Sequence, residues 1–160
     1  MTIRPAEKKD VPELLKLVKH LAEYEQLADQ AKAKIADFER YGFGDEAVFN
    51  ALLAEEEPSR RAVGFALYFF TYSTFTGKPT LYLEDLFVLP EFRGRGYGKK
   101  LLKKLAEIAV EKGCARMEWA VLDWNKPAIE FYLSLGAKPM EEWTTYRLSG
   151  EALSRLAGEG

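Results

Sequence analysis

The sequence has only one cysteine and one histidine among its 160 residues. Cys114 therefore has no partner for a disulfide within the chain, and His20 has no second histidine or cysteine with which to form a metal site. We expect Cys114 to be a buried structural thiol and His20 a solvated helix residue. Together these features predict a cytoplasmic protein that uses no metal.

Long hydrophobic runs and an excess of positive charge are also lacking. No stretch reaches the roughly 18 apolar residues of a membrane span, and the first residues, Met1 to Pro5, do not form an apolar signal region. The net charge of −2 gives no reason to expect nucleic acid as a partner. We therefore expect neither a membrane nor a nucleic acid to be a partner.

The composition that remains is typical of a globular protein, with 48% hydrophobic and 30% charged residues. A chain of this length fits one domain, which we assign to residues 1–160. Hydrophobic spacing predicts helices at 11–21, 34–41, 97–111 and 126–135, and strands at 2–4, 47–54, 62–72, 80–88, 115–121 and 138–148. We expect Asp10 to cap the first helix, Gly42 to end the second with a positive φ, 76–79 to form a hairpin turn and 157–160 to fray.

The order of these elements predicts an α/β fold with a mixed sheet. Three strands in succession favour an antiparallel meander, and the later alternation of helix and strand favours parallel pairing.

The most informative segment lies between the strand at 80–88 and the helix at 97–111. It contains the string Arg93-Gly94-Arg95-Gly96-Tyr97-Gly98, followed by Lys99. Glycines let successive backbone N–H groups converge, and the start of a helix adds positive potential. The segment therefore predicts an anion site suited to a pyrophosphate, with nearby basic side chains adding attraction.

The glycine string differs from two common nucleotide-binding loops. Its spacing is not that of a dinucleotide-binding Gly-x-Gly-x-x-Gly loop, and Lys100 stands where a triphosphate-binding loop needs serine or threonine for magnesium. A tight turn without a ligand is the remaining structural alternative.

At these residues the chain resembles the GNAT acetyltransferases, whose acetyl-CoA loop has the pattern Arg/Gln-x-x-Gly-x-Gly/Ala. The resemblance to the spermidine/spermine N1-acetyltransferase family extends over essentially the whole chain, and it is closest to the thialysine N-epsilon-acetyltransferase branch. The segments that carry it are Ala22–Glu25, Gly42–Gly44, Tyr68–Thr74, Tyr82–Asp85, Lys112–Cys114, Ala120–Asn125, Phe131–Tyr132 and Gly136–Ala137.

The resemblance implies the GNAT fold, with a central sheet that splays at the cofactor cleft, a homodimer and direct transfer in a ternary complex. The acetyl-CoA contacts it implies come from Leu86, Phe87, Val88, Arg93, Gly94, Arg95, Gly96, Tyr97, Gly98, Lys99, Asn125, Lys126, Pro127 and Ala128. The acceptor contacts would come from Tyr24, Glu25, Ser73, Phe75 and Asp85.

Transfer to an amine needs a proton acceptor, because an alkylammonium ion with a pKa near 10.4 has no free lone pair. The resemblance assigns Glu84 as a base acting through water, and Tyr132 as proton donor to the departing CoA thiolate. Adjacent strand residues point to opposite faces, so Glu84 and Asp85 serve one site only if the strand bulges there. The plain alternatives are exposed strand carboxylates for these two, packing for Tyr132 and an ordinary helix end for Glu25.

The acceptor class depends on two positions. The polyamine-acetylating branch carries aspartate and tryptophan where this chain has Ser73 and Phe75, so the site has lost a carboxylate. We therefore expect a small amine substrate such as thialysine, a lysine-like compound or a short diamine rather than spermine. A protein or peptide acetyltransferase and a non-catalytic CoA sensor stay open as alternatives.

Overall fold

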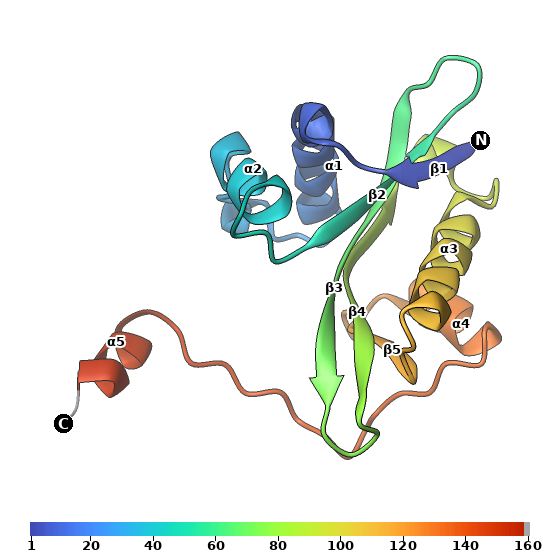
Figure 1. Cartoon of the computed structure of the whole chain (residues 1–160). Helices are drawn as coiled ribbons and strands as arrows, with labels where there is room; N and C mark the ends of the chain where they lie inside the picture. The colour runs from blue at the N-terminus through green and yellow to red at the C-terminus, as the bar shows by residue number, and fades with distance from the viewer. Residues whose placement is uncertain (159–160) are drawn as a thin grey trace. The chain divides into compact units, whose positions relative to one another are not determined.

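The computed structural model describes residues 1–158, which form two compact units, 1–122 and the residues from Asp123 onward (Figure 1). Each unit is described by itself. The first contains the whole sheet and three α-helices. Within the described residues, no helix is both long and apolar enough to span a bilayer.

The sheet of the first unit has five strands in the order β1-β2-β3-β4-β5. The first four pair antiparallel, and β5 pairs parallel to β4, which confirms the mixed sheet. The strands are β1 (Thr2–Pro5), β2 (Asn50–Glu55), β3 (Ala62–Ser73), β4 (Lys78–Val88) and β5 (Arg116–Trp119). The predicted hairpin between β3 and β4 is confirmed, but its turn lies at 74–77 rather than 76–79, because Lys78 and Pro79 already pair with β3; Gly77 has a φ of +69° in this turn.

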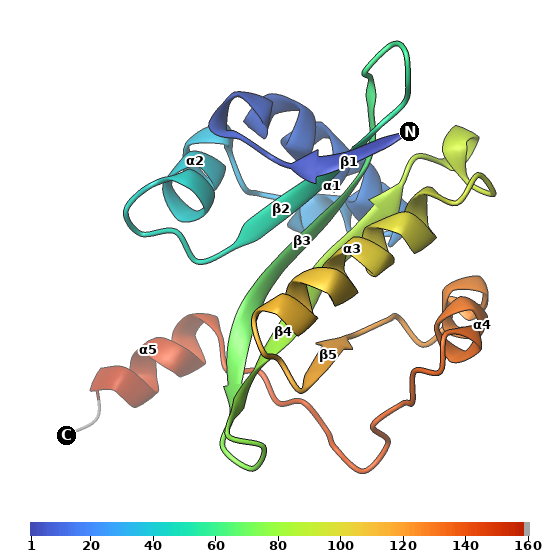
Figure 2. The same ribbon diagram turned by 45° about the vertical axis from the view of Figure 1, so that its right-hand side comes forward.

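Helices cover both faces of this sheet (Figures 1 and 2). Helix α1 (Val11–Tyr24) and helix α2 (Ile35–Phe43) lie on one face, and α3 (Tyr97–Glu111) crosses the other. The apolar stripes predicted for α1 and α3 face inward: Val11, Leu14, Leu101 and Leu105 are completely buried. Single turns of 3₁₀ helix occur at Lys8–Asp10, Ala28–Gln30 and Pro90–Phe92.

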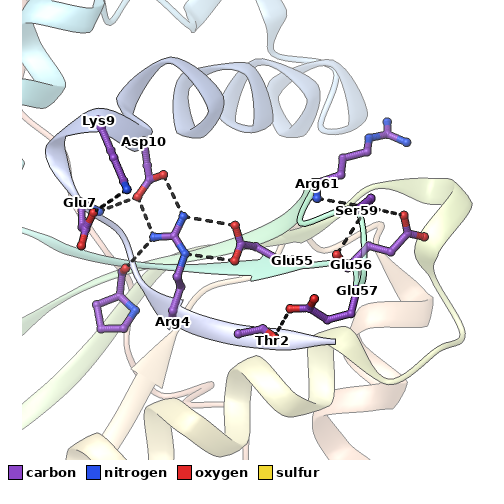
Figure 3. A network of polar contacts seen from close by, with 11 residues as sticks. Thr2, Arg4, Glu7, Lys9, Asp10, Glu55, Glu56, Glu57, Ser59 and Arg61 are labelled. Carbon is purple, nitrogen blue, oxygen red and sulfur yellow. Dashed lines mark hydrogen bonds and ion pairs between the residues drawn. The ribbon is translucent and has the colours of Figure 1, made fainter.

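The capping role predicted for Asp10 is wrong. Its side chain bonds no amide of α1; its carboxylate accepts two hydrogen bonds from the Arg4 guanidinium, at 2.8 and 2.9 Å, and one from the Glu7 backbone N–H. Arg4 also binds the carboxylate of Glu55 on β2 (Figure 3). Asp10 therefore joins the start of α1 to the sheet edge, because a buried carboxylate gains more from an arginine than from an amide.

The role predicted for Gly42 is also wrong. Helix α2 continues to Phe43, and Gly42 does not have a positive φ. A side chain at Gly42 would collide with the ring of Phe49, whose Cζ lies 2.3 Å from the position of a Cβ. Glycine lets the Phe49 ring pack closely on the helix, edge-on to Phe38 and Phe43.

The second unit begins after Leu122 and contains α4 (Lys126–Ser134) and α5 (Gly150–Gly158). The strand predicted at 138–148 is wrong: the structure assigns no strand between α4 and α5, and these residues are exposed. A strand needs a hydrogen-bonded neighbour, and Pro139 lacks an N–H donor. Helix α5 replaces part of the predicted frayed end, whose last residues, 159 and 160, lie outside the described chain.

The remaining predictions concern two side chains and the ends of two strands. His20 is exposed, as predicted, whereas Cys114 is half-buried rather than buried. Strand β2 begins at Asn50 instead of Ala47, and β5 is shorter than predicted at both ends.

Candidate active site

The glycine loop connects β4 to α3. After the turn Pro90–Phe92, Gly94 and Gly96 adopt φ angles of +78° and +86°. Residues with a Cβ rarely adopt such angles, so the backbone itself requires glycine at both positions.

The backbone does not require glycine at position 98. Gly98 lies in the first turn of α3 without a positive φ, and a Cβ placed on it would meet no heavy atom within 4 Å. Glycine inside a helix costs about 1 kcal/mol relative to alanine, and no contact in the described chain compensates for this. The absence of a side chain at Gly98 instead leaves room for a phosphate group to approach the first turn of α3.

The same turn presents backbone donors. The first N–H groups of an α-helix have no intrahelical acceptor, and in α3 the N–H of Lys100 bonds to the carbonyl of Gly96. The N–H groups before Lys100 are therefore available at the positive end of the helix, which suits an anion.

Strand β4 has an unpaired edge beside this loop. Its ladder with β5 ends at the pair Leu83 and Trp119, while its ladder with β3 continues to Val88. The last residues of β4, Glu84 to Val88, therefore have no strand on the β5 side. This is the splay that the resemblance predicts beside Leu86, Phe87 and Val88.

A β-bulge lies at Glu84. Leu83 pairs with Tyr68 and Asp85 with Leu67, so Glu84 has no partner of its own on β3. The extra residue changes which face the odd-numbered side chains occupy: Leu83 shares a face with Tyr68, and Asp85 shares the opposite face with Leu67 and Phe65. The condition under which Glu84 and Asp85 can serve one site is therefore met.

Near the bulge, the charges of two carboxylates act on a third. Burial raises the pKa of half-buried Asp85 to about 7, and the charges of Glu84 and then Glu25 add to that increase. Burial also raises the pKa of Glu25, which follows the last residue of α1. Burial, Glu84 and Glu118 raise the pKa of Tyr82 on β4. The end of α1 and the bulge of β4 thus form an acidic region.

Arg93 lies between this region and the glycine loop. Its Nε donates a 3.0 Å hydrogen bond to the carbonyl oxygen of Val88. Its Cζ lies 4.6 Å from the ring centre of Tyr24 and 5.4 Å from that of Phe87. The two rings themselves are 6.3 Å apart.

Two further arginines surround Phe92, which is buried. The Cζ atoms of Arg61 and Arg95 lie 5.3 and 5.1 Å from its ring centre, and Tyr97 meets it edge-on at 6.2 Å. The Tyr97 side chain, also buried, is therefore a packing group, and only its backbone is suited to a phosphate. The side chain of Lys99 is exposed at the start of α3.

Ser73 and Phe75 are not brought together with Asp85 in the chain. They lie at the β3–β4 turn, where buried Ser73 accepts a hydrogen bond from the Thr76 N–H and Phe75 is 96% exposed. Lys78, the partner of Ser73 on β4, is seven residues before Asp85, which at about 3.3 Å per residue separates them by roughly 23 Å.

The remaining predicted residues belong to the second unit. The Asn125 side chain accepts a 3.5 Å hydrogen bond from the Ala128 N–H and so caps α4, with Lys126 and Pro127 at the start of that helix. Tyr132, in the same helix, is half-buried, and its ring centre lies 5.8 Å from that of Phe131. The roles of these residues toward the first unit stay predictions.

Comparison with known proteins decides the family. The sequence profile of the Acetyltransferase (GNAT) family matches residues 14–137. The chain belongs to the GNAT family. As a GNAT protein it is an N-acetyltransferase, which agrees with the names of its relatives.

Several relatives match this GNAT chain over nearly its full length. A thialysine N-epsilon-acetyltransferase of Sus scrofa is 44% identical, over 98% of this chain and 97% of the relative. The spermidine/spermine N(1)-acetyltransferase-like protein 1 of Homo sapiens is 42% identical over 98% of this chain, although this covers 24% of that protein. Among solved structures, an integron cassette protein from the mobile metagenome of V. cholerae superposes with a TM-score of 0.83 at 30% identity, covering 99% and 98% of the two chains.

Sequence reasoning missed two residues that shape this GNAT site. Phe92 is an isolated aromatic residue in a polar loop, and this isolation could have indicated that its side chain is buried. Gly64 pairs with Val88, and a Cβ there would lie 2.8 Å from the carbonyl oxygen of Phe87. A single glycine inside a strand pattern indicates such a close backbone approach.

Proposed function

We propose that this GNAT enzyme transfers the acetyl group of acetyl-CoA to a primary amine of a small, cationic substrate. The observation that carries the proposal is the bulge at Glu84. It places Asp85 and Phe87 on the face of Leu67 and Phe65, opposite to the face of Leu83, on the strand that leads into the anion loop. An acidic region for a cation and a loop for a polyphosphate thus occur at one end of β4.

The described residues fit acetyl-CoA. In this proposal the N–H groups of Gly94 to Lys99 hold the pyrophosphate, with Arg93 and Arg95 beside them, and the free edge at Leu86, Phe87 and Val88 holds the pantetheine arm. The family resemblance adds Asn125, Lys126, Pro127 and Ala128 as further cofactor contacts. Acetyl-CoA supplies the acetyl group as a thioester.

Residues of the chain then accept and donate the protons of the reaction. Glu84 accepts a proton from the substrate ammonium through water, which leaves the nitrogen with a lone pair. A C–N bond forms as the C–S bond breaks, in a ternary complex without an acetylated enzyme. The hydroxyl of Tyr132 donates a proton to the departing thiolate, and the second proton that the nitrogen releases as it becomes an amide passes through water to Tyr132 and restores its hydroxyl.

We further propose a small acceptor such as thialysine, a lysine-like compound or a short diamine. Glu25, Tyr24 and Asp85 attract the ammonium group, and this one acidic region suits an acceptor with a single reactive amine. Ser73 and Phe75 lie too far from Asp85 along the strand to contact the same small molecule. The name of the 44% identical relative supports this acceptor class.

We also propose that the whole chain is one GNAT domain that works as a cytoplasmic homodimer. The family match from 14 to 137 crosses the boundary at Leu122, which supports one domain. The homodimer rests on the family resemblance. The lone cysteine supports a reducing compartment.

The test is CoA release from acetyl-CoA, followed with a thiol reagent, across thialysine, lysine, 1,3-diaminopropane, spermidine, spermine and a lysine peptide. Fast release with thialysine or another short amine supports the proposal. A preference for the peptide would assign protein acetylation, and CoA binding without any release would assign a sensor.

A further inference from the structure

Arg93 contacts both halves of the proposed site. It precedes Gly94, the first left-handed residue of the loop, and its guanidinium lies over the rings of Tyr24 on α1 and Phe87 on β4. Its Nε is bonded to the Val88 carbonyl. No other guanidinium in residues 1–158 is described in ring contact with two separate elements outside the loop.

The rings under Arg93 adjoin the acidic region. Tyr24 immediately precedes Glu25, and Phe87 is two residues beyond Asp85, on the same face of β4. The charge of Glu25 in turn acts on Asp85. The two rings that Arg93 contacts, which also pack on each other, therefore lie one residue from Glu25 and two residues from Asp85.

We propose that Arg93 is a positioning residue that couples acyl-donor binding to amine binding through the Tyr24 and Phe87 rings. A ligand that fixes the loop fixes Arg93, and Arg93 fixes the end of α1, where Glu25 lies. By thermodynamic linkage, an amine bound near Glu25 and Asp85 tightens binding at the loop by the same factor. The inference rests on the proposed function, because it assumes that the loop binds CoA and the acidic region binds an amine.

The ring faces, rather than the tyrosine hydroxyl, carry the contact. A cation attracts the face of an aromatic ring, so phenylalanine at position 24 preserves the attraction and leucine removes it. Lysine at position 93 keeps the charge but loses the flat guanidinium and the Nε donor to Val88.

The experiment measures the dissociation constant of CoA by calorimetry, without and with saturating thialysine. We expect the amine to tighten CoA binding about five-fold or more in the unmodified chain. The factor should stay for Tyr24→Phe and fall to about one for Tyr24→Leu, Arg93→Lys and Arg93→Gln. Arg61→Gln is the matched control, because Arg61 also lies over a ring but contacts neither Tyr24 nor Phe87.

Each outcome bears on a different role for Arg93. If Arg93 only attracts phosphate, CoA binds more weakly to its variants with an unchanged coupling factor, and the inference is overturned. An unmodified chain that acetylates thialysine but shows no coupling overturns the inference and leaves the proposed function standing. A chain that binds CoA but acetylates no amine overturns the proposed function. Thermal unfolding of each variant excludes simple loss of the fold.

Discussion

Gly96 and Gly98 are two residues apart but are glycines for different reasons. Gly96 has a left-handed backbone, so alanine is strained there by about 1–2 kcal/mol. Gly98 is helical and open, so alanine there gains about 1 kcal/mol of helix stability.

We therefore predict opposite stability changes and a shared functional loss. Gly96→Ala lowers the unfolding midpoint in urea, and Gly98→Ala raises it. Both weaken CoA binding, because the new methyl group lies at the start of α3. Urea unfolding and calorimetry check this; a Gly98→Ala variant with full CoA affinity would contradict the proposed phosphate site.

Asp85 gives a prediction with a pH dependence. Its pKa in the folded chain is about 7, above its ordinary value, so between those values the folded state holds a proton that the unfolded state has released. The folded chain therefore loses stability as pH rises from about 4 to about 7, and the full cost of ionising Asp85 remains above pH 7. Asp85→Asn should therefore be more stable than the unmodified chain at pH 8, with little difference near pH 4.

The same substitution should impair amine binding. Above pH 7 the ionised Asp85 attracts an ammonium group, so in the unmodified chain KM for thialysine should fall as pH rises. Asparagine carries no charge, so the variant should have a higher KM that does not fall with pH. Urea midpoints at pH 4 and 8 and KM profiles measure both effects. Glu118→Gln is the control, and equal behaviour of the two variants would refute a special role for Asp85.

Tyr132 provides the test of proton donation to the thiolate. Tyr132→Phe should leave CoA affinity nearly unchanged and lower kcat by about 10²-fold or more, the scale of general acid catalysis. Tyr146→Phe, at a 93% exposed residue of the same unit, should keep full turnover. Unchanged kcat in Tyr132→Phe would reject the assignment.

At the scale of elements, the pairing of β3 with β4 positions the loop. Gly64 allows the two backbones to approach at Val88, and a Cβ would lie 2.8 Å from a backbone oxygen that has no freedom to rotate away. Gly64→Ala should destabilise the chain by about 1–3 kcal/mol, the usual range for overpacking. It should also weaken CoA binding, because β4 shifts at Val88.

Urea unfolding and CoA calorimetry measure both effects. A Gly64→Ala variant with unchanged stability would mean that the strands separate without strain, contrary to this structure.

The elements themselves were largely predictable. Helical and alternating hydrophobic spacing identified α1, α3, β3 and β4, and the glycine string located the loop. The capping of α1 was not predictable, because the carboxylate of Asp10 binds Arg4 and that contact depends on β1 lying against β2. The prediction of a strand at 138–148 failed for a related reason. An alternating pattern is a local property of the sequence, whereas a strand also requires a neighbouring strand to which it can hydrogen-bond.

The residues of the candidate site could be identified from the sequence, but their arrangement in space could not. The sequence identified Glu84 and Asp85 yet left open whether they serve one site, because a bulge is a property of two paired strands. The position of Arg93 over two rings likewise depends on the end of α1, about 70 residues earlier in the chain.

At the scale of the molecule, the first unit is held at its edge by Arg4, which binds Asp10 and Glu55 (Figure 3). The hydrogen bonds from Arg4 hold the pKa of Asp10 below its ordinary value. A lowered folded pKa stabilises the protein above the unfolded pKa, and that contribution is lost as pH falls through the folded value.

Asp10→Asn should therefore destabilise the chain by about 1–3 kcal/mol at pH 7 and by much less near pH 3. Urea unfolding at both pH values measures this. Asp37→Asn is the control, since Asp37 also accepts a backbone N–H, from Lys34, but is exposed. An equal loss at both pH values would show that the charge of Asp10 does not matter.

The bulge at Glu84 also means that β4 has one residue more than its pairing with β3 requires. Before the bulge, odd-numbered side chains share a face with Tyr68; beyond it, they share the opposite face with Leu67. Deleting Glu84 would restore simple alternation while Leu83 stays opposite Tyr68 and Asp85 stays opposite Leu67, so Asp85 and Phe87 would keep their present face. Such a deletion removes a carboxylate and the bulge together, whereas Glu84→Gln removes only the charge.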